Sequence, residues 1–175
     1  MNDAKFRKHQ NTMIVCGWGV LVLGIWSVLR IVLSLSMEFK QFVNNTILPY
    51  FSEKDWDYEK LIVTIVIVCI FIISFIDVFI RLMICLSASA EGRGKKKKGF
   101  YVVLIVLLLL INLLSIISSV DNFYSDAVMT LTEIIANLLL TVTDFVITAD
   151  LLVATISVRH ERKKREKRKA VLEGS

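Results

Sequence analysis

The sequence is poor in cysteine, histidine and proline, and these scarcities exclude several kinds of protein. Among its 175 residues are three cysteines, two histidines and one proline. Cys16, Cys69 and Cys85 all lie within or at the edges of apolar runs, so the sequence predicts no disulfide framework. No cysteines and histidines are spaced as metal ligands, and we therefore expect no metal site.

Motifs for catalysis are absent as well. The sequence contains no HExxH, no glycine-rich phosphate loop and no nucleophile with a matching histidine. Its carboxylates alone do not define a reaction. We therefore expect a protein that is not an enzyme and that carries no cofactor.

What the sequence has in abundance is apolar residues. They make up 55% of the chain, and the mean hydropathy is +0.66, which is more than a soluble domain of this size can bury. Four continuous runs are each long enough, as helices, to cross a ~30 Å hydrocarbon core. The runs lack the alternation of membrane strands. The sequence thus predicts an all-α integral membrane domain over residues 1–158, with four transmembrane helices at about 12–36, 61–86, 100–120 and 127–158.

The distribution of charge predicts how these helices are oriented. Basic residues precede the first run, lie between the second and third, and dominate residues 159–175, whereas the other two connections are acidic. Because basic segments stay on the cytoplasmic side, we expect both termini in the cytoplasm and the chain in the plasma membrane. The net charge of +5 then needs no nucleic-acid partner. Candidates for contact with anionic lipid headgroups are Arg162, Lys163, Lys164 and Arg165.

Residues 37–60 form the only long connection on the opposite side of the predicted membrane. This segment is rich in aromatic residues, which gather at the level of the lipid headgroups. We expect a short helix lying on the membrane around residues 37–43. Pro49, the only proline, follows it and interrupts any further helix.

Polar residues are arranged regularly along the fourth run. Counted at 100° per residue, most of them fall within an arc of about 80°. Such residues cost roughly 2–3 kcal/mol each in hydrocarbon, so this α-helical stripe must face protein or water. The stripe consists of Asp126, Thr130, Glu133, Asn137, Thr141, Asp144, Thr148 and Thr155. About 140° away lies a weaker second line, namely Thr132, Thr143, Asp150 and Ser157, so more than one side of this helix is expected to be contacted.

Charged residues in the other runs suggest ion pairs within the membrane. Asp77 and Arg81 lie one helical turn apart and can neutralise each other. When positions are compared by depth at ~1.5 Å per residue, Arg30 matches Glu133 and Arg81 matches Asp150. The sequence therefore predicts one ion pair in the outer half of the membrane and one in the inner half.

The four carboxylates inside the runs outnumber the two arginines, which leaves two of them without a side-chain cation. Such groups must be protonated, hydrated or bound to a mobile cation. The sequence therefore predicts an oligomeric cation or proton channel or transporter. Its path would be lined by Asp144, Asp77, Glu133, Asn137, Thr141, Thr148 and Asn112. The alternative is a non-catalytic membrane scaffold or accessory subunit in which the polar stripe is an interface between helices.

Overall fold

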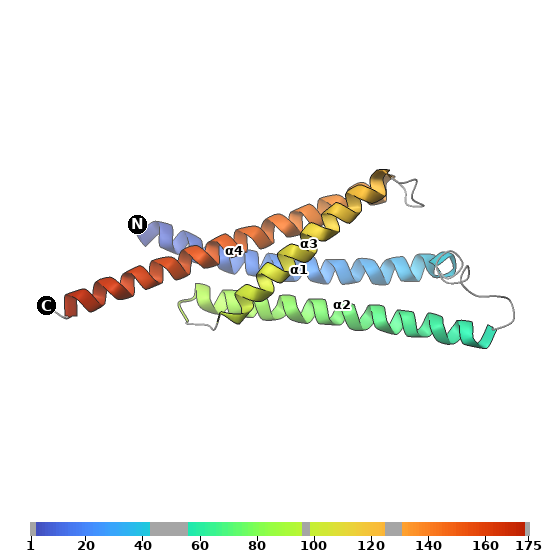
Figure 1. Ribbon diagram of the computed structural model, residues 1–175, viewed down its shortest axis with the longest axis horizontal. Helices are drawn as coiled ribbons and strands as arrows, with labels where there is room; N and C mark the ends of the chain where they lie inside the picture. The colour runs from blue at the N-terminus through green and yellow to red at the C-terminus, as the bar shows by residue number, and fades with distance from the viewer. Residues whose placement is uncertain (1–2, 43–55, 96–98, 125–130, 174–175) are drawn as a thin grey trace. The chain divides into compact units, whose positions relative to one another are not determined.

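The computed structural model of the chain describes residues 3–42, 56–95, 99–124 and 131–173, which form four α-helices (Figure 1). The helices are α1 (Asp3–Phe42), α2 (Trp56–Gly92), α3 (Phe100–Tyr124) and α4 (Leu131–Glu173). Each contains a stretch long and apolar enough to cross a membrane: Ala4–Leu33, Val63–Gly92, Phe100–Val120 and Ile135–Arg168. The described residues contain no strand. The predictions of an all-α chain and of four helices able to span a membrane are confirmed.

Most of the helices extend beyond the predicted spans, and α1 already begins at Asp3. Residues 37–42 are the last turns of α1 rather than a separate helix, and residue 43 lies outside the described part. Their location at a membrane interface stays a prediction. Helix α2 continues to Gly92 because the small residues at 87–90 contain no stop signal. Helix α4 continues through the basic segment to Glu173, so this segment is helical where it is described.

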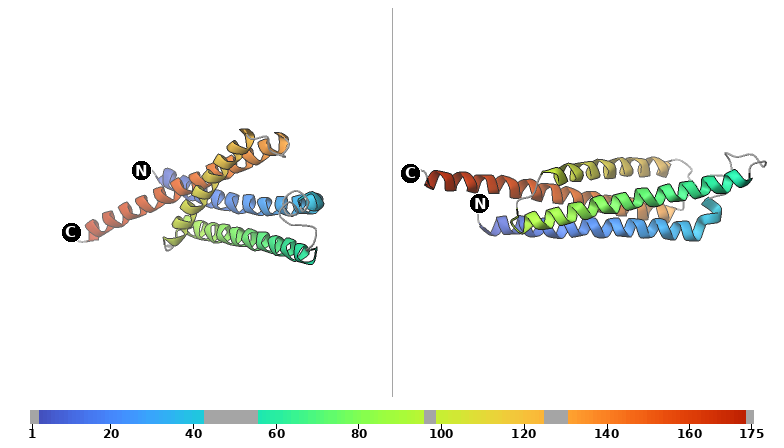
Figure 2. Two further views of the ribbon diagram at one scale, coloured as in Figure 1. Left: turned by 45° about the vertical axis from the view of Figure 1, so that its right-hand side comes forward. Right: turned by 90° about the horizontal axis from the view of Figure 1, so that it is seen from below.

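The chain divides into two units, and the larger one is built from parts of all four helices. This four-helix unit comprises Met1–Leu21 and Leu82–Ser175, and α3 and α4 lie side by side in it, running in opposite directions (Figure 2). Apolar residues from each helix are buried there. They are Met13, Val20, Leu21, Ile84, Cys85, Ala88, Tyr101, Ile105, Leu108, Leu151, Ala154 and Val158.

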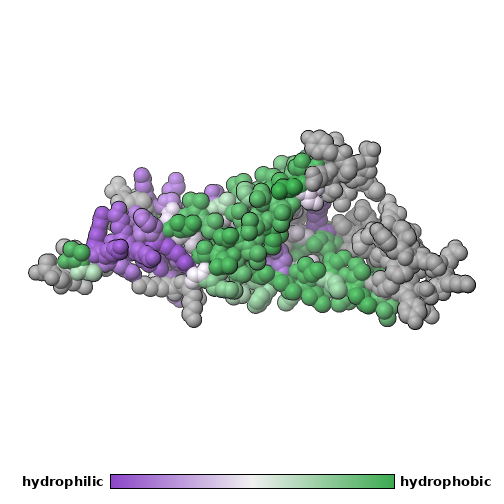
Figure 3. Space-filling view, in the orientation of Figure 1, coloured by the Kyte–Doolittle hydropathy of each residue, from purple (hydrophilic) through white to green (hydrophobic). Residues whose placement is uncertain are grey.

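The smaller unit, Val22–Arg81, is a hairpin made of the second part of α1 and the first part of α2. Few of its side chains are buried, because two helices can cover only one side of each other. Only 6% of the most apolar stretch of α2, which lies within Val63–Gly92, is buried. On the face shown in Figure 3, apolar residues cover α2 and α3, whereas hydrophilic residues gather over the C-terminal part of α4. Apolar surface of this extent suits contact with lipid.

A glycine allows α1 and α2 to approach closely inside the four-helix unit. A Cβ atom at Gly17 would lie 3.3 Å from the Cβ of Ala88 and 3.6 Å from the Cα of Cys85. Small residues of this kind let the backbones of membrane helices pack against each other.

We expect Gly17→Leu to lower the free energy of unfolding by about 1–3 kcal/mol, because the larger side chain forces the two helices apart. Unfolding in detergent micelles, followed by circular dichroism, measures the change. The matched control is Val15→Leu on the same helix, since Val15 is 69% exposed and should tolerate the added volume. Equal stability of the two variants would contradict the close packing at Gly17.

Candidate functional site

The polar stripe of α4 faces inward along much of its length. Asp144 is 7% exposed, and Thr148 and Thr155 are completely buried. Thr141 and Asn137, nearer the start of the helix, are half-buried. The stripe therefore faces protein of this chain, which is one of the two surroundings, protein or water, that its pattern allows. The predicted site residue Glu133 belongs to α4, but its side chain lies outside the described part.

Two of the threonine hydroxyls in the stripe are satisfied by the backbone of α4 itself. Thr141 donates to the carbonyl oxygen of Asn137 at 2.9 Å, and Thr155 donates to that of Leu151 at 2.8 Å. Bonds to the carbonyl four residues earlier are a common way for a threonine to reside in an apolar helix. These hydroxyls are thus engaged in local structure.

Helix α3 contributes a polar residue, Asn112, to the part of the four-helix unit in which Asp144 of α4 is buried. Tyr101 of α3 lies near Thr155 of α4, and in an antiparallel pair this places Asn112 about level with Asp144. Asn112 is 5% exposed, and its Nδ2 has no hydrogen-bond partner among the described residues, nor has the Oγ1 of Thr148. Asp144 itself takes part in a polar or electrostatic interaction. The α3–α4 pair therefore buries several polar groups in the middle of its span.

In the hairpin unit, Arg81 pairs with Asp77 one turn earlier on α2. The Nε of Arg81 donates to Oδ2 of Asp77 at 2.9 Å, with the two side chains 7% and 37% exposed. Gly24 of α1 makes room for Arg81, because a Cβ atom there would collide with the Cδ of the arginine. Arg81 also takes part in a further interaction. Asp77 and Gly24, both in the hairpin unit, thus help to position this cation.

The other predicted ion pairs join residues of different units and remain predictions. Arg30 is half-buried in the hairpin unit, and its expected partner Glu133 has no described side chain. Asp150, the expected partner of Arg81, is exposed on α4 in the four-helix unit.

A buried carboxylate that sequence reasoning missed, Glu91, joins three helices. Arg159 of α4 donates from Nε to Oε1 and from Nη2 to Oε2, at 2.9 Å each. Tyr101 of α3 donates its hydroxyl to Oε2 at 2.5 Å, and its ring centroid lies 5.2 Å from the guanidinium carbon of Arg159. The Glu91 side chain is 2% exposed and that of Arg159 is 33% exposed. In this Glu91 cluster (Glu91, Tyr101 and Arg159), both carboxylate oxygens are hydrogen-bonded and the two charges balance.

The end of α2 helps to fix Glu91 in place. The amide of Lys95 donates to the carbonyl of Ala90 at 3.1 Å, and that of Gly94 donates to the carbonyl of Glu91 at 3.0 Å. This is a Schellman motif, and Gly94 adopts the φ of +89° that it requires. Arg162 of α4 donates to the carbonyls of Glu91 and Lys95 at 3.2 and 3.4 Å. Its positive charge lies at the negative end of the α2 dipole.

The basic extension of α4, residues 159–173, is only partly available to ligands. Arg162 is engaged at the end of α2, and the guanidinium carbon of Arg165 lies 4.3 Å from the ring centroid of Phe6. Of the four residues predicted to contact lipid, Lys163 and Lys164 are exposed. The exposed cations of the extension with described side chains are Lys163, Lys164, Lys167 and Arg168.

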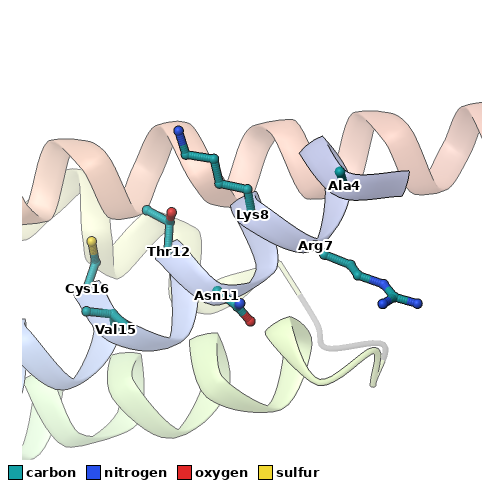
Figure 4. Close-up of a pocket in the computed structure, with 7 residues that line it drawn as sticks. All are labelled: Ala4, Arg7, Lys8, Asn11, Thr12, Val15 and Cys16. Carbon is teal, nitrogen blue, oxygen red and sulfur yellow. The ribbon is translucent and has the colours of Figure 1, made fainter. Parts of the chain in front are cut away.

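An open groove runs along the first turns of α1 in the four-helix unit (Figure 4). Arg7 and Lys8 point to different sides of α1 near its N-terminus, and Cys16 lies at the other end of the groove. Cys16 is close enough to Asp150 of α4 to be affected by its charge. No three His, Cys, Asp or Glu side chains of the described residues are grouped as metal ligands. The groove is an open furrow on the surface of α1, lined by both polar and apolar side chains.

The sequence does contain one signal for Glu91. It is the only carboxylate between Asp77 and Asp121, and it lies in the connection predicted to be basic. No local pattern links it to Arg159, which is 68 residues away along the chain. Comparison with family models, with curated proteins and with solved structures finds no match for this chain.

Proposed function

We propose that the chain is a non-catalytic scaffold of the plasma membrane, with both termini in the cytoplasm. The burial of the α4 stripe carries this proposal, because Asp144, Thr148 and Thr155 are enclosed by protein. A conduction path needs polar groups that water or an ion can reach. Enclosed groups instead hold membrane helices together through hydrogen bonds and close packing.

The Glu91 cluster supports a scaffold that presents a fixed basic helix. It holds α4 at Arg159, where the apolar part of the helix gives way to the basic extension. Arg162 and Arg165 add contacts with α2 and α1 along the next turns. Because α4 is unbroken through this region, its exposed lysines keep fixed positions relative to the four-helix unit. The positive-inside rule places them beside the cytoplasmic leaflet.

The partner that this helix suits best is the anionic headgroup of a phospholipid. Basic residues near a negatively charged leaflet each contribute about 1 kcal/mol to binding. Further exposed cations at the same end of the four-helix unit are Lys5, Arg7, Lys8, Arg93 and Lys95. Together with the basic extension they form a surface that complements anionic lipid.

We expect replacement of Lys163, Lys164, Lys167 and Arg168 by glutamine to abolish a preference for anionic lipid at the extension. A fluorophore on a single cysteine at Val171, which is 73% exposed, reports the lipids nearby in proteoliposomes. Spin-labelled phosphatidylglycerol should quench it more than spin-labelled phosphatidylcholine, and the difference should shrink in 0.5 M salt because of screening to about 4–5 Å.

The matched control replaces Lys5, Arg7 and Lys8 by glutamine, which removes three exposed cations from α1 and leaves the extension intact. This control should keep the preference at Val171. Equal quenching by both lipids in the unmodified chain would argue against lipid as the partner of the extension.

A further inference from the structure

A second face of α4 is exposed within the part of the helix that can span a membrane. Its side chains follow one another at alternating spacings of four and three residues, which is the heptad spacing of helices that pack side by side. We call this face the α4 seam. It consists of Leu139, Thr143, Val146, Asp150, Val153 and Ser157. The three apolar members are 64%, 51% and 59% exposed, Thr143 and Asp150 are exposed, and Ser157 is half-buried.

Asp150 is the member of the seam that requires a partner. It lies nine residues before Arg159, the first residue of the basic extension, which is about 13 Å along the helix axis. An aspartate side chain is too short to reach the headgroups from there. Among the described residues, no hydrogen bond or ion pair involves its carboxylate, and its one charge-sensitive neighbour there is the Cys16 thiol of α1, which cannot supply a positive charge. Thr143 differs, because its hydroxyl donates to the carbonyl of Leu139 at 2.7 Å.

We propose that two copies of this chain pair in parallel along the α4 seam, with the two Asp150 side chains hydrogen-bonded across the interface. Copies of one chain insert in the same orientation, so their α4 helices run parallel and each seam residue meets its own copy. Two carboxyl groups at one site share a proton, which reduces the charge held in the hydrocarbon. The pairing is independent of the proposed scaffold function and of its lipid partner.

The order of residues in the seam favours a pair in a single register. Thr143, Asp150 and Ser157 occupy the a positions of the heptad, and the apolar residues occupy the d positions. A polar residue at an a position specifies register and the number of helices in the assembly. The opposite side of α4 is filled by its own chain, with Thr148, Leu151 and Thr155 buried. The seam is thus the side on which a second α4 can pack.

Disulfide cross-linking in native membranes tests this geometry. Single cysteines are placed in a chain whose own three cysteines are replaced by alanine, at Val146 or Val153 in the seam. Controls are Ile156, 56% exposed but outside the seam on α4, and Leu114, 65% exposed on α3. Mild oxidation should give covalent dimers at the two seam positions and not at the two controls. Equal cross-linking at all four positions, or none at Val146 and Val153, would overturn the proposal.

Energy transfer between labelled copies, measured as the protein is diluted in lipid, tests the role of Asp150. Asp150→Asn should preserve the dimer, because two amides also hydrogen-bond across an interface. Asp150→Val should raise the dissociation constant about 3- to 30-fold, the range for one polar contact between membrane helices. Thr143→Val is the control and should have little effect, since this hydroxyl is bonded within its own helix. A chain that is monomeric at every dilution, or an Asp150→Val dimer as tight as the unmodified one, would refute the pairing through Asp150.

Discussion

Arg159→Met is expected to lower the free energy of unfolding by about 3–5 kcal/mol, the cost of leaving a buried charge without its partner. The variant keeps most of the apolar stem of Arg159 and removes the guanidinium that binds both oxygens of Glu91. Glu91 is 2% exposed, so its carboxylate cannot turn to water. Only the hydroxyl of Tyr101 would still donate to it.

Replacing Glu91 instead should lower the free energy of unfolding by less. This asymmetry distinguishes the Glu91 cluster from a simple ion pair. Glu91→Gln leaves behind a cation that is 33% exposed and that water can solvate, and the amide can still bond to Tyr101. The double variant Glu91→Met with Arg159→Met should regain part of the loss, because an apolar pair leaves no buried charge. Together with the single variant Glu91→Met, the unmodified chain, Arg159→Met and the double variant form a double-mutant cycle, measured by unfolding in detergent. Lys164→Met is the control, an exposed cation of the same helix. If Arg159→Met were no more harmful than Lys164→Met, Glu91 would not depend on Arg159.

The sequence was sufficient to predict the four helices but not the contact that fixes three of them together. Apolar runs determine the helices, because a lipid-spanning segment must satisfy its own backbone hydrogen bonds. The direction of the α4 stripe followed from its period, and Asp144 and Thr148 are indeed buried. The Glu91 cluster had no such period. It depends on α2 continuing through residues 87–90 and on the packing of α3 and α4, which are tertiary effects.

The stripe also shows what a helical pattern leaves open. Its period requires protein or water on that side of α4, and both a pore and a packed interior satisfy the requirement. Charge counting across the chain favoured a pore, because four carboxylates face two arginines within the predicted runs. The structure weakens the case for a pore, since Asp144 is enclosed and takes part in an interaction. A carboxylate engaged in this way contributes to folding.

Asp144→Asn therefore provides the second decisive prediction, in which folding and conduction are measured on the same protein. We expect the free energy of unfolding to fall by about 1–3 kcal/mol, because an amide cannot reproduce every interaction of a buried carboxyl group. Thr143→Val on the exposed side of α4 is the control and should change it by less than about 0.5 kcal/mol.

In liposomes under a potassium, sodium or proton gradient, neither the unmodified chain nor Asp144→Asn should carry current if the stripe is a packing interface. Flux in the unmodified chain that disappears in Asp144→Asn, while the unfolding free energy stays the same, would place a conduction path at Asp144. Such a result would replace the scaffold by a channel, because a residue that serves only packing cannot alter transport without altering stability. Loss of stability without flux in either protein would instead assign Asp144 to the helix interface that Thr148 and Asn112 share with it.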